Sequence, residues 1–226
     1  MDMAHPTFSE DRVLHMQGVC DESEVVDPPL FAIACVRGGK ELGMQWAEEG
    51  RRRQKHRCFE DFKAAADVLV EAGLTSRAQL GIWGRSNGGL LVLACITKWP
   101  EMAAAVVADV PLADMLRFHT AGGGRNWVVE YGDPEDAEDA EYLRSYSPVH
   151  NVPLEGIKVP VVCITSATDQ NVVPWHSYKI VAALQQAGTP ARLLLTDRTG
   201  HGQAPGLAAQ SRNTATAMVV LDSLLK

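Results

Sequence analysis

The sequence predicts an α/β fold in which a mainly parallel sheet is flanked by helices, and two observations indicate it. Short apolar runs bounded by turn residues recur along the chain, as is typical of buried strands. Stretches with apolar residues at helical spacing separate these runs, and strands that alternate with helices pack as a parallel sheet. The runs expected to form strands are residues 31–36, 79–83, 104–110, 159–165 and 191–196.

Three stretches between these runs are expected to be helices. Residues 58–72 place apolar side chains three and four positions apart and are closed by Gly73, a common C-terminal stop. Residues 87–98 end shortly before Pro100, and residues 174–187 are followed by Gly188. The stop signal after each stretch supports its assignment as a helix.

The composition is that of one ordinary globular domain. With 226 residues, of which 46% are hydrophobic and 22% charged, the chain is long enough to bury one large core. A formal net charge of −7 argues against a nucleic-acid partner, because binding to a phosphate backbone depends on an excess of Lys and Arg. Apolar runs such as residues 90–96 are far shorter than the roughly 20 residues of a membrane-spanning helix. We therefore expect neither nucleic acid nor a membrane as a partner.

The first 28 residues are interpreted as a poorly specified leader, and residues 29–226 as the folded domain. The leader lacks periodicity, and its opening residues contain Asp2 and Pro6 where a secretory signal needs a basic start and an apolar run. The cysteines show no CxxC pair and no zinc-ligand spacing, so we interpret them as reduced thiols. They are Cys20, Cys35, Cys58, Cys95 and Cys163. A cytoplasmic protein is expected.

A local basic run, residues 51–57, is the exception to the acidic composition. Glu48 and Glu49 precede it, and Glu60 and Asp61 follow shortly after it, so neighbouring acids balance part of its charge. We interpret it as the solvated start of a helix rather than as a nucleic-acid contact, because basic patches that bind nucleic acids usually belong to net basic domains.

The sharpest local signal is a Gly-x-Ser-x-Gly pattern formed by Gly84, Ser86 and Gly88. It follows an expected strand and precedes an expected helix, which is the context of the nucleophile turn in α/β-hydrolases. The tight turn exposes the seryl oxygen and is expected to need hydrogen in place of a side chain at Gly84 and Gly88. Because the helix starts beside Ser86, the main-chain N–H of Asn87 is the expected oxyanion donor. The alternative is a glycine-rich turn with a bystander serine.

A serine nucleophile needs a base, and this fold supplies its triad in the chain order Ser, acid, His. Asp169 comes shortly after the strand expected at 159–165, and His201 follows the last expected strand between Gly200 and Gly202. Ser86 is therefore expected to attack, His201 to act as base and then acid, and Asp169 to orient the imidazole and stabilise its charged form.

Another acidic residue and other histidines compete for these roles. Asp197 lies only four residues from His201, so it reaches the far ring nitrogen less easily than Asp169 does. His119 and His176 lie near expected helices and are equally well explained as surface or core residues. The remaining histidines lack a position at a strand end; they are His5, His15, His56 and His150. No metal-ligand spacing or phosphate-binding loop is evident, so no metal or cofactor is expected.

Beyond these signals, separate blocks of sequence resemble the catalytic domain of the prolyl oligopeptidase family in order and spacing. The resemblance covers about residues 31–205. The blocks are Val36–Gly39, Cys58–Phe62, Gly84–Gly89, Asp114–His119, Trp127 with Glu130–Gly132, Tyr146–Pro148, Val172–Pro174 with His176–Ser177, and Gly200–Gly202. It implies the same triad, Ser86, Asp169 and His201, within a catalytic domain that we take as residues 29–226.

The resemblance also implies a specificity pocket of proline size. Trp127 would stack on the proline ring of the substrate, with Tyr131, Val172 and Leu112 as further walls. A flat indole face suits a pyrrolidine ring at low entropic cost. The alternative for Trp127 is an ordinary core tryptophan.

Three features depart from the family pattern. Only about 30 residues precede the match, which leaves no room for the β-propeller of the family and predicts an N-terminally truncated chain without the early strands of the sheet. An exposed strand edge would then favour self-association. The tyrosine that the family uses as a second oxyanion donor is missing, and removing one such donor typically costs about 10²–10³ in turnover. Asn171 stands two residues after Asp169, where the family usually has an arginine.

The sequence thus predicts a serine-type peptidase that hydrolyses short peptides, after proline, through an acyl-enzyme. Two alternatives stay open. One is an esterase or acylaminoacyl-type hydrolase, because the same triad cleaves esters more readily than amides. The other is a weakly active or inactive fragment that acts only with a partner.

Overall fold

The computed structural model describes residues 29–196, 200–201 and 207–226, and divides the chain into two compact units, Met1–Cys35 and Val36–Lys226. The described part of the first unit, residues 29–35, contains no helix or strand. The prediction of a strand at residues 31–36 is therefore wrong. An apolar run alone does not specify a strand, which also needs a neighbour in register, and the pairing nearest to it is an isolated bridge between Arg37 and Gly39. The expected leader, 1–28, lies outside the described residues.

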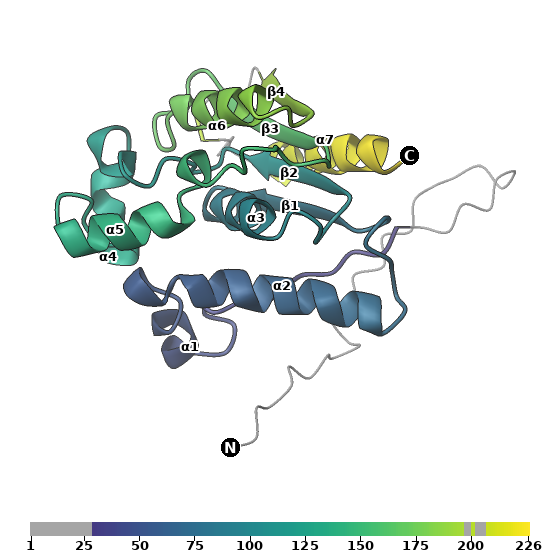
Figure 1. Ribbon diagram of the computed structural model, residues 1–226, viewed down its shortest axis with the longest axis horizontal. Coiled ribbons are helices and arrows are strands. Elements are labelled where there is room, and N and C mark those ends of the chain that lie inside the picture. The colour runs from purple at the N-terminus through teal and green to yellow at the C-terminus, as the bar shows by residue number, and fades with distance from the viewer. Residues whose placement is uncertain (1–28, 197–199, 202–206) are drawn as a thin grey trace, which may run out of the picture. The chain divides into compact units, whose positions relative to one another are not determined.

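The second unit is built on a parallel sheet in the order β1-β2-β3-β4 (Figure 1). Its strands are β1 (Gly81–Arg85), β2 (Ala105–Asp109), β3 (Val161–Ser166) and β4 (Ala191–Thr196). The four strand predictions here are confirmed to within two residues at each end. Because all four run in one direction, the loops that follow them gather at one edge. Within the described residues β1 forms one side of the sheet, and self-association through that side stays a prediction.

Alternate residues of the central strands enter two separate hydrophobic clusters, as the two-residue period of a strand requires. Val106, Ala108, Val161 and Cys163 join the larger cluster, together with residues of α2, α3 and α6. Val107, Val162 and Ile164 face the other way and pack with residues of α7. The sheet is thus buried on both faces, which explains why its strands are apolar runs rather than alternating ones.

Helices cover both faces of the sheet (Figure 1). On the larger cluster, α3 (Asn87–Lys98) contacts β1 and β2, α6 (Trp175–Gln186) contacts β3 and β4, and α2 (His56–Glu71) packs against α3. On the other face, α7 (Leu207–Leu225) contacts β1 and β2. These positions confirm the expected helices at 58–72, 87–98 and 174–187. The shorter elements are α1 (Met44–Glu48), η2 (Arg52–Gln54), η3 (Phe118–Thr120), η4 (Gly124–Trp127), α4 (Val128–Tyr131), α5 (Ala137–Tyr146) and η5 (Pro148–His150).

The two longest of the helices that were not expected are α5 and α7. The helix α5 has an N-terminal signal that the periodicity analysis missed, because the Asp136 side chain caps it by accepting the N–H of Asp139 at 2.9 Å. The long helix α7 is rich in Ala, Thr and Ser and so has little contrast between its faces. Of the helices in the described residues, none is both long and apolar enough to span a membrane.

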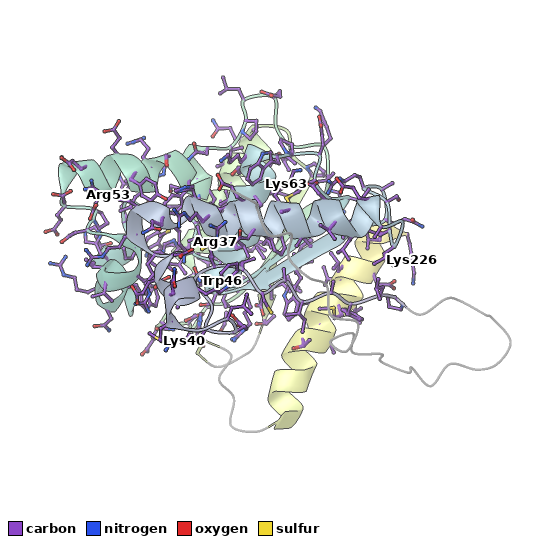
Figure 2. All side chains as sticks on the ribbon, turned by 90° about the horizontal axis from the view of Figure 1, so that it is seen from below. Arg37, Lys40, Trp46, Arg53, Lys63 and Lys226 are labelled. Atoms are coloured by element: carbon purple, nitrogen blue, oxygen red, sulfur yellow. The ribbon has the colours of Figure 1, made fainter. Side chains whose placement is uncertain are left out.

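The start of the second unit is held to α2 by Arg37 (Figure 2). The Arg37 Nε donates to Asp61 Oδ2 at 2.8 Å, its main-chain N–H donates to the same oxygen at 2.9 Å, and its guanidinium lies 5.7 Å from the Trp46 ring centroid. Gly50 lies so close to the main chain of Gly38 that no side chain fits there. These contacts give a physical reason for Arg37 and Gly50, and Gly38 adopts a φ of 95°, which favours glycine.

The basic run at 51–57 departs from expectation at Lys55, which is 2% exposed rather than solvated. Its ammonium donates to Glu130 Oε1 at 2.8 Å and lies 5.0 Å from the centroid of the Tyr131 ring. Arg51 pairs with the other oxygen of Glu130 at 3.0 Å. A buried ammonium is tolerated when it is paired and hydrogen-bonded. The partner, Glu130, is distant in the sequence, so the basic run alone does not predict the burial of Lys55.

Candidate active site

Ser86 lies in a strained turn between β1 and α3. Its backbone angles are φ 57° and ψ −115°, a positive-φ conformation that residues other than glycine rarely adopt. The Ser86 N–H donates to the carbonyl of Asp109 at 2.8 Å, and the Ser86 carbonyl accepts from the N–H of Leu90 at 3.1 Å. The strain is thus held by β2 on one side and by the first turn of α3 on the other.

The glycines around Ser86 do not all have the expected role. A side chain at Gly84 would collide with the main-chain oxygen of Gly88, so hydrogen is needed there. A Cβ at Gly88 would meet no described residue within 4 Å, so the expected steric need at Gly88 is wrong. The constraint falls instead on Gly89, where a Cβ would lie 2.7 Å from Pro111 Cβ. The close approach of Pro111, from the loop after β2, was invisible in the local motif.

Asp169 lies in the loop after β3 and its side chain is fully buried. Its Oδ1 accepts the main-chain N–H groups of Asn171 at 2.9 Å and Val172 at 3.0 Å. Its Oδ2 lies 2.7 Å from His201 Nδ1. The two backbone donors fix the carboxylate, which leaves its second oxygen directed at the imidazole.

His201 joins the acid to the serine. Its Nε2 lies 3.1 Å from Ser86 Oγ while its Nδ1 contacts Asp169, so one ring spans both partners. The neighbouring Gly200 N–H donates to Thr168 Oγ1 at 3.2 Å, which ties the histidine loop to the acid loop. The structure thus brings the three residues chosen from the sequence within hydrogen-bonding reach. The rival Asp197 lies outside the described residues.

Two other histidines, His119 and His176, have different surroundings. His176 is buried, and its Nδ1 accepts the main-chain N–H groups of Ala113 at 3.2 Å and Asp114 at 3.1 Å. Burial lowers the pKa of His176 to about 3, so it is neutral at ordinary pH. His119 lies 3.5 Å from the exposed Glu135. His176 is therefore a structural residue of the core, one of the two alternatives that the sequence left open.

Asn87 is the first residue of α3, so its N–H has no acceptor within the helix. Its side-chain oxygen accepts a hydrogen bond of 2.9 Å from the hydroxyl of Tyr131. The Asn87 side chain is thereby held against α4, which leaves its main-chain N–H beside Ser86 at the N-terminus of α3. This is the position expected for an oxyanion donor.

The four residues expected to form the specificity pocket belong to one packed region. Leu112, Tyr131 and Val172 are 2%, 4% and 2% exposed and lie in the larger hydrophobic cluster. Trp127 packs against the same cluster but is only partly buried. Of the four side chains, the indole is therefore the one with most surface left to offer a ligand.

The segment that contains Trp127 is anchored at both ends to the candidate site. At its start, the Gly123 N–H donates to the carbonyl of Asn171 at 3.0 Å. A side chain at Gly123 would also approach the Trp127 ring to 3.1 Å and collide with the side-chain oxygen of Asn171. At its end, Tyr131 bonds to Asn87. The indole therefore lies between the loop of Asp169 and the helix that follows Ser86.

Two contacts of the site were missed from the sequence. Thr168 Oγ1 accepts a hydrogen bond from the Gly200 N–H, and Arg85 Nη2 donates a hydrogen bond to the main-chain carbonyl of His201. A Thr just before the acid and an Arg just before the nucleophile have no distinctive local signal, since their partners lie more than thirty residues away. Within the described residues, no three His, Cys, Asp or Glu side chains gather as a metal site.

Comparison with known proteins gives consistent similarities. A family model described as the prolyl oligopeptidase family matches residues 29–220. A prolyl endopeptidase of Dictyostelium discoideum is 39% identical over 192 residues, which cover 82% of this chain and 25% of the relative. A solved prolyl endopeptidase structure is 40% identical with a TM-score of 0.78, covering 84% of this chain and 28% of that chain. A post-proline cleaving enzyme from Rickettsia typhi is 35% identical with a TM-score of 0.77, covering 84% and 28%. The chain spans about a quarter of the length of these curated relatives.

Proposed function

Because the chain belongs to the prolyl oligopeptidase family, we propose that it acts as a serine-type peptidase that hydrolyses short peptides after proline. The observation that carries the proposal is the double contact of His201, 3.1 Å to Ser86 Oγ and 2.7 Å to Asp169 Oδ2. With one contact on each ring nitrogen, the imidazole can accept the proton of the serine at Nε2 while the carboxylate at Nδ1 orients the ring.

The proposed reaction begins with attack of Ser86 Oγ on the carbonyl carbon of the scissile bond. His201 Nε2 accepts the hydroxyl proton, and Asp169 stabilises the imidazolium through Nδ1. The oxyanion of the tetrahedral intermediate accepts the N–H of Asn87 at the start of α3. His201 then gives its proton to the departing amine, which leaves the acyl group on Ser86. Water, activated by the same imidazole, releases the acid and regenerates the serine.

The preference for proline rests on Trp127. Its partly buried indole lies between the anchored ends of residues 123–131, next to the loops of both Ser86 and Asp169. A flat aromatic face recognises a rigid ring through stacking and excluded water. The buried Leu112, Tyr131 and Val172 support the indole from within the core, and we propose that they shape the floor of the pocket rather than its mouth.

Labelling with a fluorophosphonate probe tests the mechanism, because the probe reacts only with a serine activated by a base. We expect the wild-type chain to be labelled and Ser86→Ala and His201→Gln to be unlabelled. Ser145→Ala, which removes an exposed hydroxyl bonded only to the carbonyl of Tyr142 among described contacts, is the matched control and should be labelled like wild type. A folded wild-type chain that resists the probe would contradict the proposal.

Substrate class is tested separately from the mechanism. Turnover of a proline anilide, an alanine anilide and p-nitrophenyl acetate is compared on the same preparation. A peptidase with proline preference cleaves the proline anilide faster than the alanine anilide. Ester cleavage alone would instead support the esterase alternative, since esters need less stabilisation of the leaving group and the oxyanion than amides do.

A further inference from the structure

Arg85 joins three parts of the site through one side chain. It is the last residue of β1 and directly precedes Ser86. Its Nε lies 3.3 Å from Asp109 Oδ2, and its Nη2 donates to the main-chain carbonyl of His201. The guanidinium therefore contacts the end of the neighbouring strand and the loop that bears the imidazole.

Asp109 makes this arrangement part of the nucleophile turn. It is the last residue of β2, stands opposite Arg85 in the sheet register, and its side chain is fully buried. Its main-chain carbonyl accepts the N–H of Ser86 at 2.8 Å. Asp109 therefore contacts both the main chain of Ser86 and the guanidinium of Arg85, and that guanidinium in turn contacts the main chain of His201.

The loop of His201 is consequently held on two sides. Gly200 donates to Thr168 Oγ1 at 3.2 Å, toward the acid loop, and the His201 carbonyl accepts from Arg85, toward the nucleophile. The ring itself must keep Nε2 at 3.1 Å from Ser86 Oγ and Nδ1 at 2.7 Å from Asp169. A shift of the backbone on either side moves the ring out of reach of one partner.

We propose that Arg85 is a positioning residue that holds the main chain of His201 in register with Ser86, an inference that rests on the proposed function. A guanidinium suits this task because its rigid planar fork can keep an ion pair with a carboxylate on one side while an N–H on the other side donates to a carbonyl. The buried Asp109 also offsets a positive charge that would otherwise oppose the imidazolium formed in the reaction. Arg85 touches neither Ser86 Oγ nor the His201 ring in the described contacts, so it acts through the backbone.

Arg77 provides a matched control within the same chain. It too bridges a carboxylate, Asp67, and a main-chain carbonyl, that of Met102 at 3.0 Å. Its side chain is 35% exposed, against 33% for Arg85. However, Arg77 and Met102 precede β1 and β2, so this bridge lies at the amino ends of the strands, opposite the edge of Ser86 and His201. Arg77→Met therefore removes the same kind of contact without touching the site.

The experiment compares Arg85→Met, Arg85→Lys and Arg77→Met in the full chain by three measurements. The first is the melting temperature, the second is the rate of fluorophosphonate labelling with kcat and KM for p-nitrophenyl acetate, and the third is NMR. Labelling histidine with ¹³C at the carbonyl and glycine with ¹⁵N isolates one peptide bond, because His201–Gly202 is the single His-Gly pair in the sequence. Its carbonyl resonance reports directly on the hydrogen bond from Arg85.

We expect Arg85→Met to move the His201 carbonyl resonance upfield and to lower the labelling rate and kcat by about 10- to 100-fold, with little change in KM, because misplacing a catalytic group by about 1 Å costs this much. Arg85→Lys should recover part of the rate, since an ammonium donates to the carbonyl without the geometry of the fork. Arg77→Met should leave the resonance unchanged and the labelling rate within about twofold of wild type, because it is remote from the site.

Three results would overturn the role of Arg85. They are an unchanged carbonyl resonance in Arg85→Met, a moved resonance with a wild-type labelling rate, and an equal loss of labelling in Arg77→Met. If Arg85→Met does not fold, Arg85→Gln replaces it and is judged by the same outcomes, because its amide is a donor that is too short to span both acceptors. Failure of the proposed function is seen separately, as a wild-type chain that is folded but not labelled.

Discussion

The hydroxyl of Tyr131 donates a hydrogen bond of 2.9 Å to the side-chain oxygen of Asn87, the residue that follows Ser86. Burial raises the pKa of Tyr131 well above its usual value, so the phenol stays protonated and remains a donor at all ordinary pH values. The bond connects the end of α4 to the start of α3. It thereby couples the segment that bears Trp127 to the helix end where negative charge develops in the proposed reaction.

We expect Tyr131→Phe to lower the free energy of unfolding by about 0.5–1.5 kcal/mol, the usual net contribution of one hydrogen bond. We also expect fluorophosphonate labelling to slow by about 3- to 10-fold, because Asn87 loses the contact that fixes it beside Ser86. Urea unfolding and labelling rates measure the two effects.

Tyr142→Phe is the control for this prediction. The Tyr142 hydroxyl accepts the main-chain N–H of His56 at 3.0 Å, at the start of α2, so its loss should cost similar stability. Labelling of Tyr142→Phe at the wild-type rate would assign the slower labelling of Tyr131→Phe to Asn87. Equal slowing in both variants would contradict the link.

Replacing Trp127 by alanine should separate recognition from chemistry. We expect Trp127→Ala to lose about 10- to 100-fold more kcat/KM on a proline anilide than on p-nitrophenyl acetate, because the ester needs no ring contact. Trp99→Ala is the matched control, since Trp99 is another partly buried tryptophan that packs against the same cluster. Equal losses on both substrates in Trp127→Ala would refute the pocket assignment and favour a core role.

The glycines of the nucleophile turn give opposite predictions at neighbouring positions. Gly84→Ala should destabilise the chain by about 1–3 kcal/mol, because its Cβ collides with the main-chain oxygen of Gly88 and the turn must open. Gly88→Ala should instead stabilise it by about 0.5–1 kcal/mol, since its Cβ meets no described residue and alanine favours the helix. Melting temperatures of the two variants measure both effects, and a destabilised Gly88→Ala would contradict the second prediction.

The parts of the fold that local sequence encodes were predictable. The strands β1 to β4 are apolar because both faces of the sheet are covered, and α3 begins at Asn87 because the strand-turn-helix context of Ser86 requires it. The choice of Asp169 and His201 followed from the same logic, because loops after parallel strands share one edge. The structure places His201 within reach of Ser86, and Asp169 within reach of His201.

What could not be predicted depends on contacts between distant segments. The burial of Lys55 is explained by Glu130, and the need for glycine at position 89 by Pro111, neither of which a local motif contains. The contacts of Arg85 and Thr168 with the loop of His201 arise from sheet register and loop closure. The strand expected at 31–36 failed for the complementary reason, because an apolar run does not specify its partner.

We expect much of the decrease in the free energy of unfolding at acid pH to come from His176. Burial lowers the pKa of His176 from 6.5 to about 3. Below pH 6.5 the unfolded chain therefore takes up a proton that the folded chain refuses, so the stability that is fully present above pH 6.5 is lost as the pH falls toward 3. The slope contributed by one such group approaches about 1.4 kcal/mol per pH unit. Urea unfolding at several pH values between 6.5 and about 4.5 measures it.

His176→Asn isolates this contribution, because the asparagine side-chain oxygen can accept the N–H groups of Ala113 and Asp114 in place of Nδ1 but does not titrate. Burial also lowers the pKa of His150, so the variant should retain a shallower slope rather than none. The carboxyl of Asp114, whose pKa burial alone would raise, is held below its usual value of 3.8 by Lys179, so it contributes only at lower pH. A slope unchanged by His176→Asn between pH 6.5 and about 4.5 would contradict this assignment, because it would show that the pKa of His176 is the same in the folded and unfolded chains.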